Sequence, residues 1–332
     1  MTHVMPEARG KPLFTIFTPT HNRAHTLPRV YESVAAQELR DFEWVIVDDG
    51  STDNTRDLVA QWIDDADFPI RYFYQSHGHK KTAYNYGIRE ARGELFVCWD
   101  SDDAALPQSL RILHDAWLAI PEATRDTYVG ITGLCVYEDG RIFGDTYRES
   151  PYDSDPVEST LCDKIRGDKS GFQRVDILRQ YPFPEFIEGL VPEGVIWNAI
   201  ARTYKTRYIN EAVLTYHVEQ DSIINSTNTL AKIRSMAVGR GFFAAEFLTH
   251  DWRWFFRAPV EVLKIAANHT RYAWHMWRGG RHRGFPPAGL AGWMLKLAAW
   301  PVGFLVFLYE ELRLRSPCDG ILSMAASNKS SH

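Results

Sequence analysis

The sequence contains little cysteine and none of the local cysteine patterns that hold small folds together. Its cysteines, Cys98, Cys135, Cys162 and Cys318, lie far apart, and no Cys-x-x-Cys pair occurs. Their spacing argues against a disulfide framework and against a zinc cluster. Residues 1–10 also lack the apolar run of a secretory signal. We therefore expect a protein of the reducing cytoplasm.

The usual phosphate-binding glycine motifs are missing as well. The chain contains neither Gly-x-x-x-x-Gly-Lys-[Ser/Thr] nor Gly-x-Gly-x-x-Gly. A P-loop and a standard dinucleotide fingerprint are therefore not supported. A nucleotide bound by this chain would have to be held by other groups, such as carboxylates and a metal ion.

Charge is unevenly distributed along the 332 residues. Residues 1–227 contain 23 Lys and Arg against 36 Asp and Glu, whereas residues 228–316 contain 13 against 5. Such a split indicates two regions with different partners. The basic region suits an anionic membrane surface or nucleic acid. We expect the membrane surface, through residues 285–315, and no nucleic acid.

The first part of the chain alternates strand-like and helix-like patterns. Short apolar runs predict strands over 13–18, 42–47, 70–74 and 95–99, and helical periodicity predicts helices over 27–35, 58–63, 82–91 and from Pro107. This alternation predicts an α/β fold with a mostly parallel sheet and helices on both faces. Further on, we expect strands over 129–137, 141–147 and 208–217, a helix over 193–204, and a polar loop or lid over 149–169.

Polar side chains gather where three of the predicted strands end. They are the stretches Thr18-Pro19-Thr20, Asp48-Asp49 and Asp100-Ser101-Asp102-Asp103. In open α/β sheets, the carboxyl ends of the strands are where ligands bind. The alternative is that these residues only cap helices and close turns. Three such groups on one edge favour a binding site.

Carboxylates two residues apart at a strand end suit a hard divalent cation. Asp100 and Asp102 could bind Mn²⁺ or Mg²⁺, which take one or two carboxylates and complete their shell with water and substrate phosphates. Asp49 could accept hydrogen bonds from a nucleobase or a ribose. Lys80, just before the helix expected over 82–91, could meet phosphate charge. A solvated lysine is the alternative for Lys80.

Several ordered motifs resemble the family 2 glycosyltransferases. They are Phe17-Thr18-Pro19-Thr20-His21-Asn22-Arg23, then Phe42–Asp53, which contains Val47-Asp48-Asp49-Gly50-Ser51, then Gly87–Glu94, and Trp99-Asp100-Ser101-Asp102-Asp103. The resemblance covers roughly residues 13–220. It implies a GT-A fold, which is Rossmann-like, a nucleotide-sugar donor, and inversion at the anomeric carbon.

The resemblance also implies roles for individual residues. Thr18 and Pro19 would line the nucleotide pocket, Asp49 would contact the nucleobase, and Asp100 would lie by the ribose or the sugar. Asp102 would ligate the metal. Asp103 would orient its neighbours.

An inverting displacement needs a base for the acceptor hydroxyl. Glu185, Glu188 and Glu193 are the candidates, and Glu193 lies where the family shows its catalytic Asp or Glu. Many members have Glu-Asp there, whereas this chain has Pro192-Glu193, so Glu188 stays open as an alternative. A purely helix-capping role for Glu193 is the other interpretation. His217 is a candidate ligand of the metal or the diphosphate, with a structural histidine as the alternative.

The basic region is rich in aromatic residues and long apolar helical patterns. Six of the eleven tryptophans lie beyond residue 228, and Lys296 is the only charge between 288 and 309. Pro301 and Gly303 interrupt this run, so we expect an interfacial or re-entrant helix rather than a clean span, and a buried helical hairpin is the alternative. We expect domains over 1–227 and 228–316 and a disordered tail over 317–332.

These expectations together describe an inverting, metal-dependent glycosyltransferase, peripheral at the inner face of the membrane. Its donor would be a nucleotide sugar with UDP as the expected nucleotide, and its acceptor a saccharide or a lipid-linked saccharide in cell-surface polysaccharide or glycolipid assembly. The alternatives are a nucleotidyltransferase and a non-catalytic nucleotide-sugar-binding scaffold at the membrane. A nucleotidyltransferase would normally show a glycine-rich basic loop near its start, which Thr18–Arg23 is not.

Overall fold

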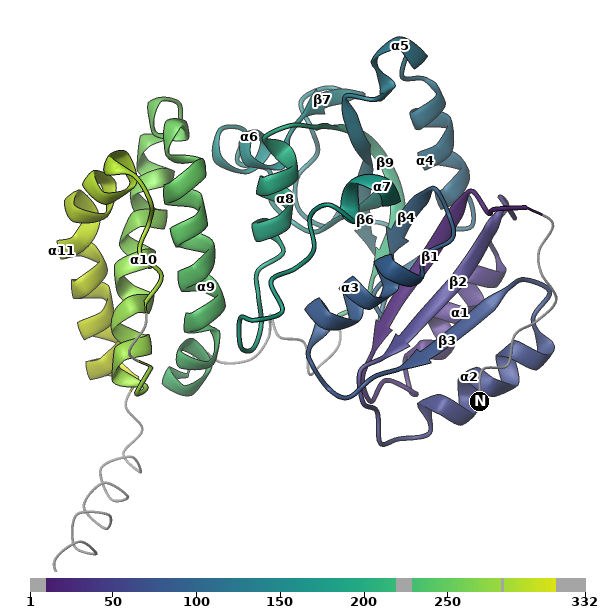
Figure 1. Ribbon diagram of the computed structural model, residues 1–332. Helices are drawn as coiled ribbons and strands as arrows, with labels where there is room; N and C mark the ends of the chain where they lie inside the picture. Colours follow the sequence, from purple (N-terminus) through teal and green to yellow (C-terminus); the bar gives the residue numbers. More distant parts are fainter. Residues whose placement is uncertain (1–9, 219–228, 282–283, 315–332) are drawn as a thin grey trace, which may run out of the picture. The chain divides into compact units, whose positions relative to one another are not determined.

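The computed structural model describes residues 10–218, 229–281 and 284–314 (Figure 1). These residues form two compact units. The first contains residues 10–185 and 196–218, and the second contains residues 186–195 and 229–314. The expected domain boundary at residue 227 and the expected tail over 317–332 lie outside the described residues.

A nine-stranded sheet forms the centre of the first unit, as far as its residues are described. Its main order is β3-β2-β1-β4-β8-β6-β9-β5, and β7 pairs with β9. The strands are β1 (Phe14–Thr20), β2 (Phe42–Asp48), β3 (Ile70–Tyr74), β4 (Leu95–Cys98), β5 (Ala104–Ala105), β6 (Tyr128–Tyr137), β7 (Tyr152–Ser154), β8 (Lys169–Arg174) and β9 (Lys205–Tyr216).

Strands β3, β2, β1 and β4 are parallel neighbours, as the alternating pattern predicts. The side chains of β2 are buried on both faces, which is usual for a parallel sheet covered by helices on both sides. In the other half, β8 runs antiparallel to β4 and β6, and β9 is parallel to β6. The parallel half therefore sends the carboxyl ends of β1, β2 and β4 to one edge.

Helices cover both faces of this sheet. Tyr84 of the helix α3 packs its ring against Phe17 and Phe96 on one face, while Val30 and Leu110 pack with Trp44 in the core of the other. The helices of the first unit are α1 (Leu27–Ala35), α2 (Thr55–Asp65), α3 (Lys80–Glu90), α4 (Ser109–Leu118), α5 (Glu122–Arg125), α6 (Pro156–Leu161), α7 (Val175–Leu178) and, from Ile196 on, α8 (Gly194–Ala201).

Two expectations for the middle of the chain are wrong. Residues 141–147 form no strand, and only Ile142 makes an isolated bridge, to Val136 of β6. The segment expected as a polar loop over 149–169 contains β7 and α6, and Asp155 caps α6 by accepting from the N–H groups of Val157 and Glu158. β7 is too short to show a periodic pattern, which explains why its sequence gives no strand signal.

The second unit is built from helices. They are α9 (Leu230–His250), the 3₁₀ helix η1 (Trp252–Phe256), α10 (Pro259–Arg278) and α11 (Leu290–Arg313). The sequence predicted an interruption at Pro301 and Gly303, but α11 continues through both. Gly303 has a packing role instead, because a Cβ there would lie 2.2 Å from the carbonyl oxygen of Ala267 on α10. Among the described residues, α11 is the one helix long and apolar enough to cross a membrane.

Candidate active site

The carboxyl ends of β1 and β2 bring two of the predicted polar groups together. Thr20 pairs with Asp48 across the two strands, and Pro19 pairs with Val47 within β1 rather than ending it. Proline has no N–H to give to a ladder, so a strand interior is an unusual place for it. Thr18 is fully buried, and its hydroxyl accepts a 3.0 Å hydrogen bond from the indole of Trp44. Its side chain therefore lies in the core.

Asp48 and Asp49 are neighbours with different surroundings. Asp48 accepts hydrogen bonds from the hydroxyl of Tyr72, at 2.5 Å, and from the N–H of Ser51, at 2.7 Å. Asp48 therefore closes the turn after β2. This is the turn-closing role given above as the alternative to a binding site. Burial and the contact with Asp48 raise the pKa of Tyr72.

Asp49 organises the loop between β3 and α3. Its Oδ1 accepts from Gln75 at 2.7 Å and from the N–H of Gly78 at 2.8 Å, and its Oδ2 lies 2.9 Å from Nδ1 of His77. Its carbonyl oxygen accepts from Nδ1 of His21 at 2.9 Å. The carboxylate is thus fixed at the edge and largely buried.

Three histidines surround Asp49, and the sequence did not reveal this. The rings of His21 and His77 are 4.4 Å apart, and those of His77 and His79 are 4.7 Å apart. Burial, with the charges of His77 and Lys81, lowers the pKa of His79. His21 and His77 are 56 positions apart in the sequence, so no local spacing could have indicated their contact.

Asp100 and Lys80 meet as a pair of predicted site residues. Nζ of Lys80, the first residue of α3, lies 2.8 Å from Oδ1 and 2.9 Å from Oδ2 of Asp100. Both side chains are nearly half exposed, with exposed fractions of 44% and 43%. An amine at the first turn of a helix, facing solvent, is well placed to meet an anion.

Asp102 lies beside Arg23 and Arg29, which no sequence pattern marked as site residues. The guanidinium of Arg23 is 3.8 Å from its carboxylate, and Arg29 donates to its carbonyl oxygen at 2.7 Å. Thr26 donates to the carbonyl of Ser101 at 2.7 Å. The start of α1 therefore holds the loop that carries Asp102. Arg23 stands in the motif after β1, which is the signal that could have indicated it.

Asp103 is buried, whereas the nearby acids Asp100 and Asp102 are partly exposed. Its Oδ1 accepts from the N–H of His217 at 3.3 Å, just past the end of β9. Burial raises the pKa of Asp103 to about 8, and the carboxylates of Asp100 and Asp102 add to this rise. Asp103 therefore tends to keep its proton in the folded protein.

His217 lies next to Asp103 but also has acid and carbonyl contacts of its own. Its Nε2 is 3.0 Å from Glu138, and its Nδ1 donates to the carbonyl of Thr215 at 3.3 Å. In the described part of the chain, no three His, Cys, Asp or Glu side chains are grouped so that they could hold a metal by themselves. The structure thus brings His217 to Asp103 and not into a ready-made ligand set with Asp102.

The three candidate bases are in different surroundings. Glu185, in the first unit, accepts from Asn85 at 2.8 Å and is 3.7 Å from Arg89. Glu188 and Glu193 belong to the second unit, where Glu188 lies 3.2 Å from Arg281 and is exposed. Glu193 is exposed and immediately precedes α8.

Solved structures define the class of this fold. The structure matches that of S. aureus TarS in complex with UDP-GlcNAc with a TM-score of 0.54 and 17% identity, over 88% of this chain and 80% of that chain. It matches the mannosyltransferase PcManGT from Pyrobaculum calidifontis, in complex with GDP-Man and Mn²⁺, with a TM-score of 0.54 and 18% identity, over 93% and 91% of the two chains. At these identities the likeness concerns the fold alone, and that fold is GT-A.

Sequence comparisons match the first part of the chain to a family of glycosyltransferases. Residues 15–146 match the family described as glycosyl transferase family 2. It is similar to the GalNAc(5)-diNAcBac-PP-undecaprenol beta-1,3-glucosyltransferase of Campylobacter jejuni, with 26% identity over 222 residues, which are 64% of this chain and 67% of that protein. The matches to uncharacterized glycosyltransferases of Nostoc sp. and two Rickettsia species span only 30%, 32% and 16% of their lengths.

Proposed function

We propose that this protein is an inverting glycosyltransferase that moves a sugar from a nucleoside diphosphate sugar to an acceptor hydroxyl. The observation that carries the proposal is the gathering of Asp49, Asp100 and Asp102 at one edge of the parallel sheet of a family 2 chain. That edge is where open α/β sheets bind their ligands. UDP is the proposed nucleotide, supported by the UDP-GlcNAc complex of a protein with the same fold.

The acidic edge fits a divalent cation such as Mn²⁺ or Mg²⁺. Its donors are carboxylate oxygens, which these hard ions prefer. Asp102 is the proposed ligand, with Asp100 beside the donor. When bound, the ion supplies positive charge that stabilises the departing diphosphate. The Mn²⁺ in the similarly folded Pyrobaculum structure supports this assignment.

The side chains of the edge bind and orient the donor in this proposal. Asp49 fixes the loop around the nucleobase, and Thr18 and Pro19 shape the floor of the nucleotide pocket from within β1. Lys80 and Arg23, which now face Asp100 and Asp102, would also lie near the diphosphate and offset its charge. His217 remains a proposed ligand of the metal or the diphosphate.

Glu193 is the proposed base that takes the proton of the acceptor hydroxyl as its oxygen attacks the anomeric carbon. Its exposed position ahead of α8 and its place in the family's motif order support this role. Glu193→Gln should therefore retain donor binding and lose transfer, while Glu188→Gln should keep both. If Glu188→Gln lost transfer and Glu193→Gln kept it, Glu188 would be assigned as the base. In the structure, the carboxylate of Glu188 pairs with Arg281.

The proposed acceptor is a saccharide on a lipid carrier, used in cell-surface polysaccharide or glycolipid assembly at the inner face of the membrane. The Campylobacter relative, whose name includes an undecaprenol-linked saccharide, supports this acceptor class. The long apolar helix α11 supports a membrane location.

A donor-hydrolysis screen tests the proposal. The protein is incubated with UDP-, GDP- and TDP-sugars and Mn²⁺, and release of the nucleoside diphosphate is measured. We expect release from one nucleotide class and none after Asp102→Asn. Formation of a nucleotide sugar from a nucleoside triphosphate would instead indicate a nucleotidyltransferase. Donor binding without turnover, even with acceptor lipids present, would indicate a scaffold.

A further inference from the structure

The helix α11 has an apolar face that the second unit does not cover. Its leucine and methionine side chains Leu290, Met294, Leu297, Leu305, Leu308 and Leu312 are exposed, with exposed fractions from 37% to 81%. Their spacing places them along one side of a helix. Between Leu290 and Leu312 no exposed residue is charged, because Lys296 is half-buried over the ring of Trp293 and Glu310 and Glu311 are buried. Such an extended apolar surface indicates a partner.

The opposite side of α11 is packed closely against the other helices. A Cβ at Gly292 would lie 2.5 Å from the carbonyl oxygen of Leu248 on α9, and one at Gly303 would lie 2.2 Å from that of Ala267 on α10. Ala299 is buried in the same cluster as Leu248. Small residues therefore let α11 approach its neighbours along much of its length, which fixes the direction of its apolar face.

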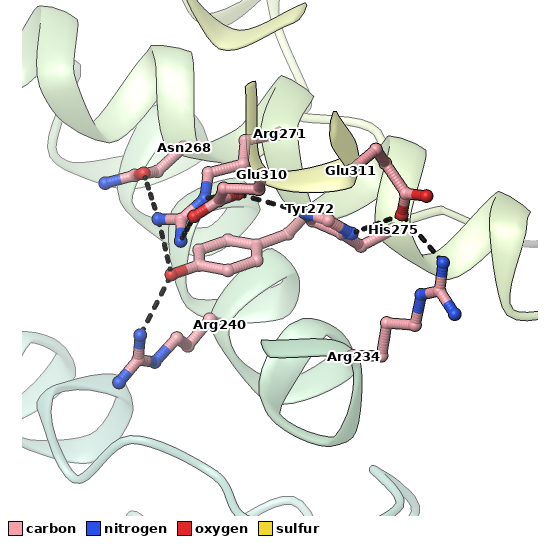
Figure 2. A network of polar contacts seen from close by, with 8 residues as sticks. All are labelled: Arg234, Arg240, Asn268, Arg271, Tyr272, His275, Glu310 and Glu311. Carbon is pink, nitrogen blue, oxygen red and sulfur yellow. Dashed lines mark hydrogen bonds and ion pairs between the residues drawn. The ribbon is translucent and has the colours of Figure 1, made fainter. Parts of the chain in front are cut away.

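A buried polar network holds the carboxyl end of α11 in the bundle (Figure 2). Glu310 accepts from Nε of Arg271 at 2.8 Å and from Nε2 of His275 at 3.0 Å. Glu311 lies 2.7 Å from Arg234 of α9. Acids near the carboxyl end of a helix are disfavoured by its dipole. Glu310 and Glu311 can occupy this unfavourable position because side chains of α9 and α10 supply the compensating charge.

The polar network bears on whether α11 lies in the plane of a membrane or crosses the membrane. The 24 residues of α11 would be long enough to span a bilayer. To do so, α11 would have to leave α9 and α10, which carry charged residues of their own, and Glu310 and Glu311 would lose their partners. Unpaired carboxylates are costly in hydrocarbon. The packed side and the network therefore keep α11 in the bundle, with its apolar face outward.

The surroundings of this face fit an anionic lipid surface. Trp293, Trp300 and Tyr309 are exposed on α11, and amphipathic aromatic rings are enriched where a membrane meets water. The basic excess over residues 228–316 adds attraction to anionic headgroups. A second copy of the chain would share this basic excess, so charge favours the lipid.

We propose that α11 lies in the interfacial plane of an anionic membrane, with its leucine-rich face inserted and its carboxyl end held in the helical unit by Arg271, His275 and Arg234. This inference rests on the proposed action at a membrane-linked acceptor and specifies how that membrane is reached. Vesicle binding and donor hydrolysis are measured separately, so each can fail without the other.

Vesicle sedimentation of the full chain tests the proposal. The vesicles are pure phosphatidylcholine, or phosphatidylcholine and phosphatidylglycerol in equal parts. We expect binding to the anionic vesicles, weaker binding to the neutral ones, and release by alkaline carbonate. The double variant Leu297→Glu and Leu305→Glu should lose at least about tenfold in binding. Leu118→Glu, on the exposed surface of α4 in the first unit, is the matched control and should bind like wild type.

Circular dichroism and donor hydrolysis establish that each variant is folded. Absence of wild-type binding, or equal binding by the double variant, would overturn the proposal. Resistance to carbonate would show a spanning helix instead. A wild-type dimer in solution that the double variant converts to a monomer, without vesicle binding, would assign the face to a second copy.

Discussion

At the sheet edge, Asp103 is buried, whereas the side chain of Asp100 three residues earlier is 43% exposed and faces Lys80. The two carboxylates share a loop and differ in what surrounds them. Asp100 can exchange its lysine partner for a ligand because water reaches both groups. Asp103 is not available to a ligand in this way, because it is buried and accepts from the N–H of His217. The exposed acid is therefore suited to binding and the buried one to holding the loop in place.

Lys80→Met tests the binding role of the exposed pair. A charge-assisted hydrogen bond is worth about 1.5 to 3 kcal/mol, so the donor KM should rise at least about tenfold. Steady-state kinetics measure the change. The free energy of unfolding should change by less than about 1 kcal/mol, because exposed ion pairs contribute little to stability.

Arg111→Met is the matched control for this change. Arg111 forms a similarly exposed pair with Glu38, at 2.8 Å, on the surface of the same unit. Its loss should leave the donor KM unchanged. If the two variants changed the donor KM equally, the assignment of Lys80 to the donor site would be wrong.

Asp103→Asn should flatten the dependence of stability on pH. Burial and its acidic neighbours raise the pKa of Asp103 from 3.8 to about 8, so between these values the folded protein holds a proton that the unfolded chain releases. The contribution of Asp103 is thus full below pH 3.8 and falls as the pH rises to about 8. Denaturant unfolding with a chelator present measures this slope, and an unchanged slope in the variant would contradict the assignment.

At the scale of elements, α11 depends on charge at its end as well as on close packing along its length. Glu310 is 8% exposed and is surrounded by Arg271 and His275. Burial lowers the pKa of His275, against the opposing effect of Glu310. The carboxyl end of α11 is thus held by ionisable side chains, each of which would be costly to bury without the others.

Glu310→Ala should destabilise the helical unit strongly. Removing one member of a buried ion pair leaves the other uncompensated and costs about 3 to 5 kcal/mol. Glu261→Ala is the control, because Glu261 pairs with the exposed Lys264 and should cost about 1 kcal/mol or less. Denaturant unfolding followed by tryptophan fluorescence measures both, and a similar small loss in both variants would contradict the role of the network.

The sequence predicts the regular part of the fold and misses the irregular part. Strands β1, β2 and β4 appear as buried apolar runs because both of their faces are covered. β7 and α6 lack such runs, since β7 has three residues and α6 six. Pro301 gives a strong breaker signal, yet α11 continues through it, because packing against α9 and α10 outweighs the local preference.

At the scale of the whole molecule, the candidate site is only partly visible in the sequence. Asp49, Asp100 and Asp102 follow predicted strands, so their common edge could be foreseen. The contact of His21 with His77, and that of Arg23 with Asp102, join distant segments and need the fold. Glu188 and Glu193 belong to the helical unit although they precede residue 227, which no composition change in the sequence indicated.

Metal-dependent donor binding at Asp102 is the central claim, and titration calorimetry tests it most directly. UDP or the nucleotide identified by the donor screen is titrated into wild type and into Asp102→Asn, each with Mn²⁺ and with a chelator. We expect Mn²⁺ to strengthen binding to wild type at least about tenfold and to have no effect on the variant. Equal strengthening by Mn²⁺ in both proteins would contradict the account.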